Sequence, residues 1–167
     1  MAIAARICDY LKNNDIEFHV VPHPFTTTSG GSARAAHVQP RQLAKAVVVE
    51  FKDTDPVRYT LAVLPASHKI DVQELSKLLN EEVQLAEESE LDALFPDCSP
   101  GAVPALAAAY GLETVAEVAL KSNDEIFFEA GDHEELIHIT AAQFDRLMAG
   151  VVFAPFSVER THDEFRR

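Results

Sequence analysis

The chain has 167 residues, of which 47% are hydrophobic and 25% are charged, a composition typical of one soluble globular domain. Its formal net charge of −13 argues against broad, non-specific nucleic-acid binding, which depends on neutralising phosphates, and so against a DNA-binding role. Two cysteines form no disulfide framework, and neither a signal peptide nor a run long enough for a membrane span is recognisable, so we expect a cytoplasmic protein.

Apolar periodicity and turn residues predict, in the first half of the chain, a helix, a strand, a loop, a short helix and a β-hairpin. The short helix is expected to begin with Ser32 as its N-cap, and the hairpin opens with the apolar strand AVVVEF. The predicted ranges are 2–14 for the helix, 16–21 for the strand, 26–32 for the loop, 32–37 for the short helix and 46–64 for the hairpin.

The second half is predicted to contain a helix that begins with the capping box Asp71 and Glu74, a short helix capped by Ser89, and a last helix capped by Thr140. Strands are expected at 83–86, 114–118, 125–130, 135–140 and 151–156. Because strands and helices follow one another without regular βαβ repetition, the sequence predicts a single α/β domain around a mixed sheet, residues 1–156, followed by a frayed tail, 157–167.

One segment of this acidic protein contains no acid. From Phe18 to Val49 there is neither Asp nor Glu, whereas about five would be expected from random placement. The segment is either a buried strand that lacks acids by chance or a pocket wall for an anionic ligand. Its cationic and histidine residues are Arg34, Arg41, Lys45, His19, His23 and His37.

Two features of the sequence are candidates for chemistry on an ester or an anion. Lys45 opens the apolar strand LAKAVVVEF, where its ammonium group either reaches water past a packed stem or binds a ligand. The segment PDCSPGAVPAL is either an ordinary rigid turn or a braced loop, whose Gly101 and Ala102 N–H groups form an oxyanion-type site.

Metal and thiol chemistry have weaker support. Asp132, His133 and His138 suggest a metal-dependent hydrolase, but the two histidines face opposite sides of a strand, and no third ligand or HExxH motif accompanies them. Cys98 has no recognisable activating base. We therefore expect neither a metal nor another cofactor.

Three segments in order resemble the YbaK/ProX family, the editing domains related to the insertion domain of bacterial prolyl-tRNA synthetases. They are LAKAVVVEF, SPGAVPAL and FFEAGDHEELIHI, and the similarity extends over about residues 20 to 150. The resemblance implies a mixed, partly barrel-like sheet flanked by helices. It also implies a metal-independent hydrolase that cleaves the ester of a mischarged aminoacyl-tRNA in trans, with water positioned by the ribose hydroxyl of the substrate.

The resemblance also assigns site residues. Lys45 would hold the tRNA end or the substrate carbonyl, Gly101 would donate its backbone N–H to the ester, and the late histidine of the synthetase domains matches His138. His133 matches a subgroup whose members can be fused to signalling domains, so which histidine faces the pocket stays open. Ala46 departs from alanine-specific relatives, which often carry Asn there. The expected substrate-binding residues are Thr28, Ser29, Ser32, Ala102, Pro104, Gly131 and His133.

The expected partners are the 3′ end of aminoacyl-tRNA and, because the protein is so acidic, a tRNA synthetase or another tRNA carrier. The alternative function is a non-catalytic module of the same fold that binds an aminoacyl ester, a nucleotide or a small metabolite. The amino acid that is cleaved is not specified by these features.

Overall fold

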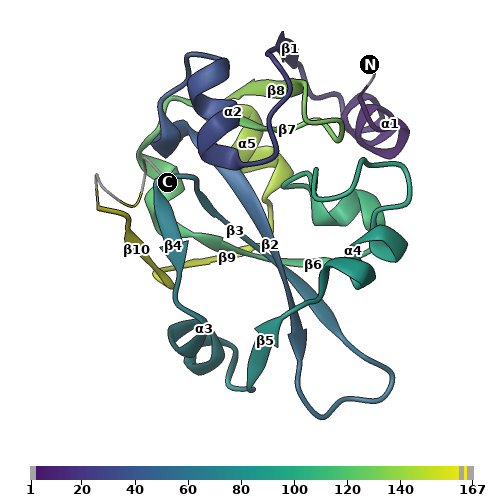
Figure 1. Ribbon diagram of the computed structural model, residues 1–167, viewed down its shortest axis with the longest axis vertical. Coiled ribbons are helices and arrows are strands. Elements are labelled where there is room, and N and C mark those ends of the chain that lie inside the picture. The colour runs from purple at the N-terminus through teal and green to yellow at the C-terminus, as the bar shows by residue number, and fades with distance from the viewer. Residues whose placement is uncertain (1–2, 162–163, 165–167) are drawn as a thin grey trace.

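The computed structural model describes residues 3–161 and residue 164 (Figure 1). The α-helices are α1 (Ala5–Asn13), α2 (Ser29–Ala35), α3 (Val72–Leu79), α4 (Glu88–Leu94) and α5 (Ala141–Leu147). The strands are β1 (His19–Pro22), β2 (Leu43–Phe51), β3 (Tyr59–Pro65), β4 (His68–Ile70), β5 (Val83–Leu85), β6 (Glu113–Glu117), β7 (Glu125–Glu129), β8 (Glu135–Thr140), β9 (Val152–Ala154) and β10 (Ser157–Glu159). Short 3-10 helices occupy Pro40–Gln42, Ala107–Tyr110 and Val118–Ser122. Within the described residues, none of the helices has the length and apolarity that crossing a bilayer requires.

The main sheet is mixed, which confirms the predicted fold class. Its strands lie in the order β1-β8-β7-β2-β3-β6-β9, and β5 pairs separately with the far end of β2. The predicted hairpins β2–β3 and β7–β8 are antiparallel, whereas β2–β7, β3–β6 and β6–β9 are parallel. In Figure 1, α2 lies beside the start of β2, while α3 and β5 lie near its far end.

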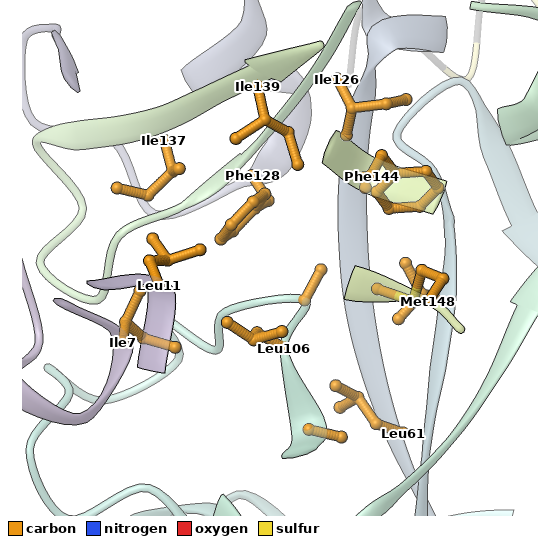
Figure 2. Close-up of a cluster of buried hydrophobic side chains, with 14 of the residues drawn as sticks. Ile7, Leu11, Leu61, Leu106, Ile126, Phe128, Ile137, Ile139, Phe144 and Met148 are labelled. Atoms are coloured by element: carbon orange, nitrogen blue, oxygen red, sulfur yellow. The ribbon is translucent and has the colours of Figure 1, made fainter. Parts of the chain in front are cut away.

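One face of the sheet carries the larger core. Figure 2 shows Ile126 and Phe128 of β7 and Ile137 and Ile139 of β8 directed toward side chains of α1 and α5. Because side chains alternate along a strand, the residues between them point to the other face. That face is covered by α2 and α3, with Leu75 of α3 fully buried.

Two helices begin earlier than the sequence predicts. α2 starts at Ser29, inside the predicted loop, because Thr28 is extended and its Oγ1 accepts the N–H of Gly31 at 3.0 Å. Ser32 is therefore inside the helix and not its cap. Similarly, Glu87 caps α4 in a reciprocal capping box, in place of Ser89. Side-chain carboxylates and hydroxyls can both accept hydrogen bonds from the first N–H groups of a helix. The sequence therefore contains more than one possible N-cap for each of these two helices.

The end of the chain also differs from the expectation of a frayed tail. Ser157–Glu159 forms β10 and pairs with β4. The residue before it, Phe156, is buried, and its N–H donates to the Glu117 carboxylate at 2.8 Å. This carboxylate also accepts the Ser157 hydroxyl at 2.6 Å. The burial of Phe156 and its hydrogen bond to Glu117 thus hold β10 in the domain, which extends beyond residue 156. Residues 162–163 and 165–167 of the predicted tail lie outside the described residues.

Candidate functional site

A cleft forms where two parallel strands separate. β2 pairs with β7 only at Leu43 and Ala44, and it pairs with β5 only from Val49 onward. Between these contacts, no strand pairs with the edge of β2 that faces away from β3. The cleft at this opening contains about 420 Å³ of empty space, including its mouth.

The main chain of Ala46 faces this opening. The N–H of Phe51 donates to the carbonyl of Arg58, just before β3, whereas the carbonyl of Val48 accepts the N–H of Ala86 on the opposite edge. Hydrogen-bonding directions alternate along a strand, so Ala46 directs its N–H and carbonyl to the same edge as Val48. This places a backbone donor and acceptor at the floor of the cleft.

Lys45 lines the cleft, as does Gly101, although 55 positions of chain separate them. The Lys45 Nζ donates to the His68 carbonyl at 2.5 Å. Burial and the positive charge of Arg160 lower the pKa of Lys45 from 10.5 to about 8. The residue remains mainly cationic at neutral pH, so an anionic group next to its ammonium is favoured.

The Gly101 loop is braced by contacts with the turn after β7 and with α1. Gly101 has φ +78, which glycine adopts at low cost. The Ser99 N–H donates to the Gly131 carbonyl at 2.8 Å, and the Asp97 carboxylate accepts the Arg6 N–H at 2.9 Å. Hydrogen bonds to residues distant in the sequence therefore stabilise the loop conformation, in addition to the restriction that its prolines impose.

The structure corrects one part of the predicted oxyanion site. The N–H of Ala102 donates to the Ser99 carbonyl at 2.9 Å and closes a turn, so it is not available to a ligand. Ala102 and Pro104 are both buried, and the cleft is lined by Val103 in their place. Among the described residues, the Gly101 N–H has no hydrogen-bond partner. Of the two predicted donors, only the Gly101 N–H is therefore available.

Of the two candidate histidines, His133 lies at the cleft. It occupies the turn between β7 and β8 with φ +66, and the residue is 6% exposed. Its Nε2 lies 2.7 Å from the Pro100 carbonyl, and its ring packs against Phe25 in a T-shaped arrangement. A side-chain carbon added to Gly101 would lie 3.8 Å from His133 Cε1, so the two residues adjoin.

His138 is not brought to the cleft. Its ring stacks on Phe127 with centroids 4.4 Å apart, and its Nε2 lies 3.2 Å from the Glu125 carboxylate. It shares a sheet face with Leu136, which does line the cleft, but it lies two residues further along β8. The structure therefore brings His133 to the cleft and not His138, which the sequence had matched to the late histidine of the synthetase domains.

The remaining predicted residues divide into two groups. Thr28, Ser29 and Ser32 line the cleft from the start of α2, as expected. Gly131 does not line it: with φ +115, it packs so closely that an added side-chain carbon would lie 2.9 Å from the Ala4 Cβ. Its role is to let the turn after β7 approach α1.

Sequence reasoning did not identify Glu129, which ends β7 and lines the cleft. Its Oε1 accepts the N–H groups of Gly131, Asp132 and His133 at 3.1 to 3.3 Å and so shapes the turn that carries His133. The available signal was the carboxylate that follows the apolar run IFF, shortly before the GDH turn.

The Asp132 and His133 side chains do not converge with His138. Asp132 Oδ1 instead accepts the N–H groups of Glu134 and Glu135, both at 2.9 Å. Within the described part of the chain, no group of three His, Cys, Asp or Glu side chains has the arrangement of a metal site. Cys98 is half-buried, and burial raises the pKa of its thiol to about 11, which disfavours the nucleophilic thiolate.

Residues 23–147, about three quarters of the chain, match the aminoacyl-tRNA editing domain family. The chain belongs to this family. Membership associates the protein with aminoacyl-tRNA editing and confirms the resemblance seen in the three sequence segments. No curated protein matches the chain significantly.

Solved structures share the fold of this editing domain at low sequence identity. A hypothetical protein, APE2540, superposes with a TM-score of 0.79 at 18% identity, covering 92% of this chain and 99% of that one. A proposed trans-editing enzyme for prolyl-tRNA synthetase has a TM-score of 0.76 at 19% identity, with 95% and 97% covered. A proposed signal-transduction protein from Marinobacter aquaeolei VT8 has a TM-score of 0.72 at 16% identity. There the match covers 95% of this chain but 31% of that longer one.

A basic groove adjoins the cleft of the editing domain. Lys45 lines both, and the groove is also lined by Arg34 of α2 and by Arg160, which follows β10. Both arginines are exposed, and the exposed Glu164 carboxylate lies in the same groove. None of these three cations forms an ion pair with a carboxylate among the described residues. The acid-free segment thus contributes two cations to one surface of an otherwise acidic protein.

Proposed function

We propose that the protein is an aminoacyl-tRNA deacylase that hydrolyses the ester of a mischarged tRNA in trans, without a metal ion. The observation that carries this proposal is the meeting of Lys45, the unpaired Gly101 N–H and His133 at one cleft. The proposal also draws on membership of the aminoacyl-tRNA editing domain family.

The peptide group between Pro100 and Gly101 has a central role in the proposed chemistry. A carbonyl only accepts hydrogen bonds, so the His133 Nε2 must carry the proton that it shares with the Pro100 oxygen. The Gly101 N–H belongs to the same planar peptide group and points opposite to that carbonyl. His133 therefore orients this N–H and strengthens it as a donor.

The reaction requires stabilisation of a negative charge on the ester oxygen while water attacks the carbonyl carbon. The Gly101 N–H donates to this oxygen, and the ribose hydroxyl of the substrate positions the water. The Lys45 ammonium binds the tRNA end, and its positive charge favours the developing anion. Neither an activated thiol nor a metal-bound water is needed.

The tRNA end approaches along the basic groove. Arg34 and Arg160 supply charge for phosphates beside Lys45. With a net charge of −13, the rest of the protein repels nucleic acid, so we expect weak tRNA affinity for the isolated chain. A synthetase or another tRNA carrier then supplies the remaining affinity. Full deacylation by the isolated protein with little dependence on salt would contradict this need for a partner.

The deciding experiment is a deacylation assay of the purified protein against a panel of mischarged tRNAs. We expect turnover of at least one substrate, and a loss of about a hundredfold or more in Lys45→Ala, the usual effect of removing an electrostatic donor. Lys77→Ala is the control, because Lys77 lies exposed on α3. Equal rates for Lys45→Ala and the parent, or inhibition by a chelator, would refute the mechanism. Binding without turnover would favour the alternative function of a ligand-binding module.

A further inference from the structure

One oxygen of the Glu129 carboxylate is left without a protein partner. Oε1 accepts three backbone N–H groups of the following turn, whereas Oε2 accepts no hydrogen bond from the described residues. The side chain is half-buried and lines the cleft. The carboxylate is thus held in place by one oxygen while the other remains available.

The cations of the site do not neutralise this carboxylate. In the parallel register of β2 and β7, Leu43 lies opposite Phe127, so Lys45 and Glu129 point to the same sheet face two residues later. The strands have separated there, and the Lys45 ammonium donates to the His68 carbonyl. Among the described residues, Glu129 forms no ion pair. A negative acceptor in a partly enclosed site favours a ligand that brings a cationic donor.

We propose that Glu129 binds the α-amino group of the aminoacyl moiety. This inference rests on the proposed function and adds a requirement on the substrate. An aminoacyl ester carries its amino group on the carbon next to the ester carbonyl. The proposed acceptor and the Gly101 donor are joined through one residue, because the His133 N–H binds Glu129 Oε1 at 3.2 Å and its ring binds the Pro100 carbonyl.

This arrangement distinguishes free amino acids from blocked ones. An α-amino group donates hydrogen bonds to a carboxylate and carries a positive charge when protonated. An N-acylated amino acid has lost that charge and two of its donors, and an α-hydroxy acid has lost the amine altogether. Peptidyl-tRNA, whose amino group is acylated, is therefore excluded as a substrate, although its ester is the same.

A binding experiment tests the inference without requiring turnover. Three adenosine analogues carry a stable amide in place of the ester, with an α-amino, an N-acetylamino or an α-hydroxy group. Their dissociation constants are measured by calorimetry. We expect the parent protein to bind the α-amino analogue about 10- to 100-fold more tightly than the other two, the usual contribution of a charge-assisted hydrogen bond.

Glu129→Gln separates ligand binding from the structural role of the same side chain. The glutamine carbonyl still accepts the three N–H groups of the turn, but an amide NH₂ replaces the free carboxylate oxygen. We expect this variant to lose the preference for the α-amino analogue and to bind the N-acetyl analogue as the parent does. Glu125→Gln is the matched control at the other end of β7, where the carboxylate contacts His138 outside the cleft, and it keeps the preference.

Equal affinity of the parent for all three analogues would overturn the inference even if deacylation is confirmed, and this comparison does not depend on the folding of any variant. An unchanged preference in Glu129→Gln would overturn it as well, as would absence of binding of every analogue. Deacylation of the tRNA panel decides the proposed function separately. Preferential binding of the amine without turnover would retain the ammonium site and reject the deacylase.

Discussion

The lowered pKa of Lys45 predicts that the free energy of unfolding increases with pH in the alkaline range. Its pKa is about 8 in the folded protein and 10.5 for an unperturbed lysine, because the folded state buries the ammonium beside Arg160. Between these two values the unfolded chain binds more protons than the folded one. The free energy of unfolding therefore rises with pH through this window, and the penalty for burying the charge is complete below pH 8.

The size of the effect follows from the two pKa values. At 1.36 kcal/mol per pH unit, the difference between 10.5 and about 8 corresponds to about 3 kcal/mol as an upper limit. Because the side chain is only half-buried, water screens part of this energy, and we expect about 1 to 2 kcal/mol.

The assay is urea denaturation of the parent and of Lys45→Met at pH 7 and at pH 10. Methionine keeps the buried stem but removes the titrating group. The parent should gain about 1 to 2 kcal/mol relative to the variant at the higher pH. Lys77→Met should follow the parent at both values, because Lys77 is exposed. A stability difference between the parent and Lys45→Met that is the same at pH 7 and pH 10 would refute the reasoning.

Three further predictions concern the elements that support the site. Gly131→Ala should destabilise the protein by more than about 2 kcal/mol, because both the φ of +115 and the close contact with Ala4 oppose a side chain. Gly150→Ala should cost only about 1 kcal/mol, because a side chain at Gly150 would extend into open space. Urea unfolding of the two variants measures the difference. Cys98 should react with iodoacetamide at neutral pH much more slowly than a free thiol, as followed by mass spectrometry, since its pKa is about 11. Glu117→Ala should lower the free energy of unfolding by about 2 to 4 kcal/mol, because it leaves the buried Phe156 N–H without an acceptor; a loss below 0.5 kcal/mol would mean that β10 does not depend on this contact.

Much of the secondary structure could be predicted because its determinants are local. The hairpin of β2 and β3 follows from AVVVEF, a turn and VRYTLAVL, and Asp71 caps α3 through its own neighbours. Where several local solutions compete, the sequence alone does not choose. Thr28 and Ser32 are both good caps, and the burial of Ala33 together with the Thr28–Gly31 hydrogen bond selects the earlier start of α2.

Site residues were predictable where chemistry and resemblance coincided, as for Lys45 and Gly101. The choice between His133 and His138 was not, since both lie in GDHEELIHI and each has a reasonable role there. The answer depends on which one the turn after β7 directs at the loop of Gly101. In the same way, the sequence could not show that the Ala102 N–H, a predicted donor to the ligand, instead donates to the Ser99 carbonyl within a turn.

Thus the order of amino acids determined most of the element types, the family and several residues that line the cleft, because periodicity, capping and motif order are properties of neighbours along the chain. Only the tertiary structure decided that β2 and β7 part after two paired residues, that one backbone N–H is free where two were expected, and that Glu129 borders the opening. Those outcomes depend on distant segments that compete for the same hydrogen bonds and the same space, which no stretch of sequence specifies by itself.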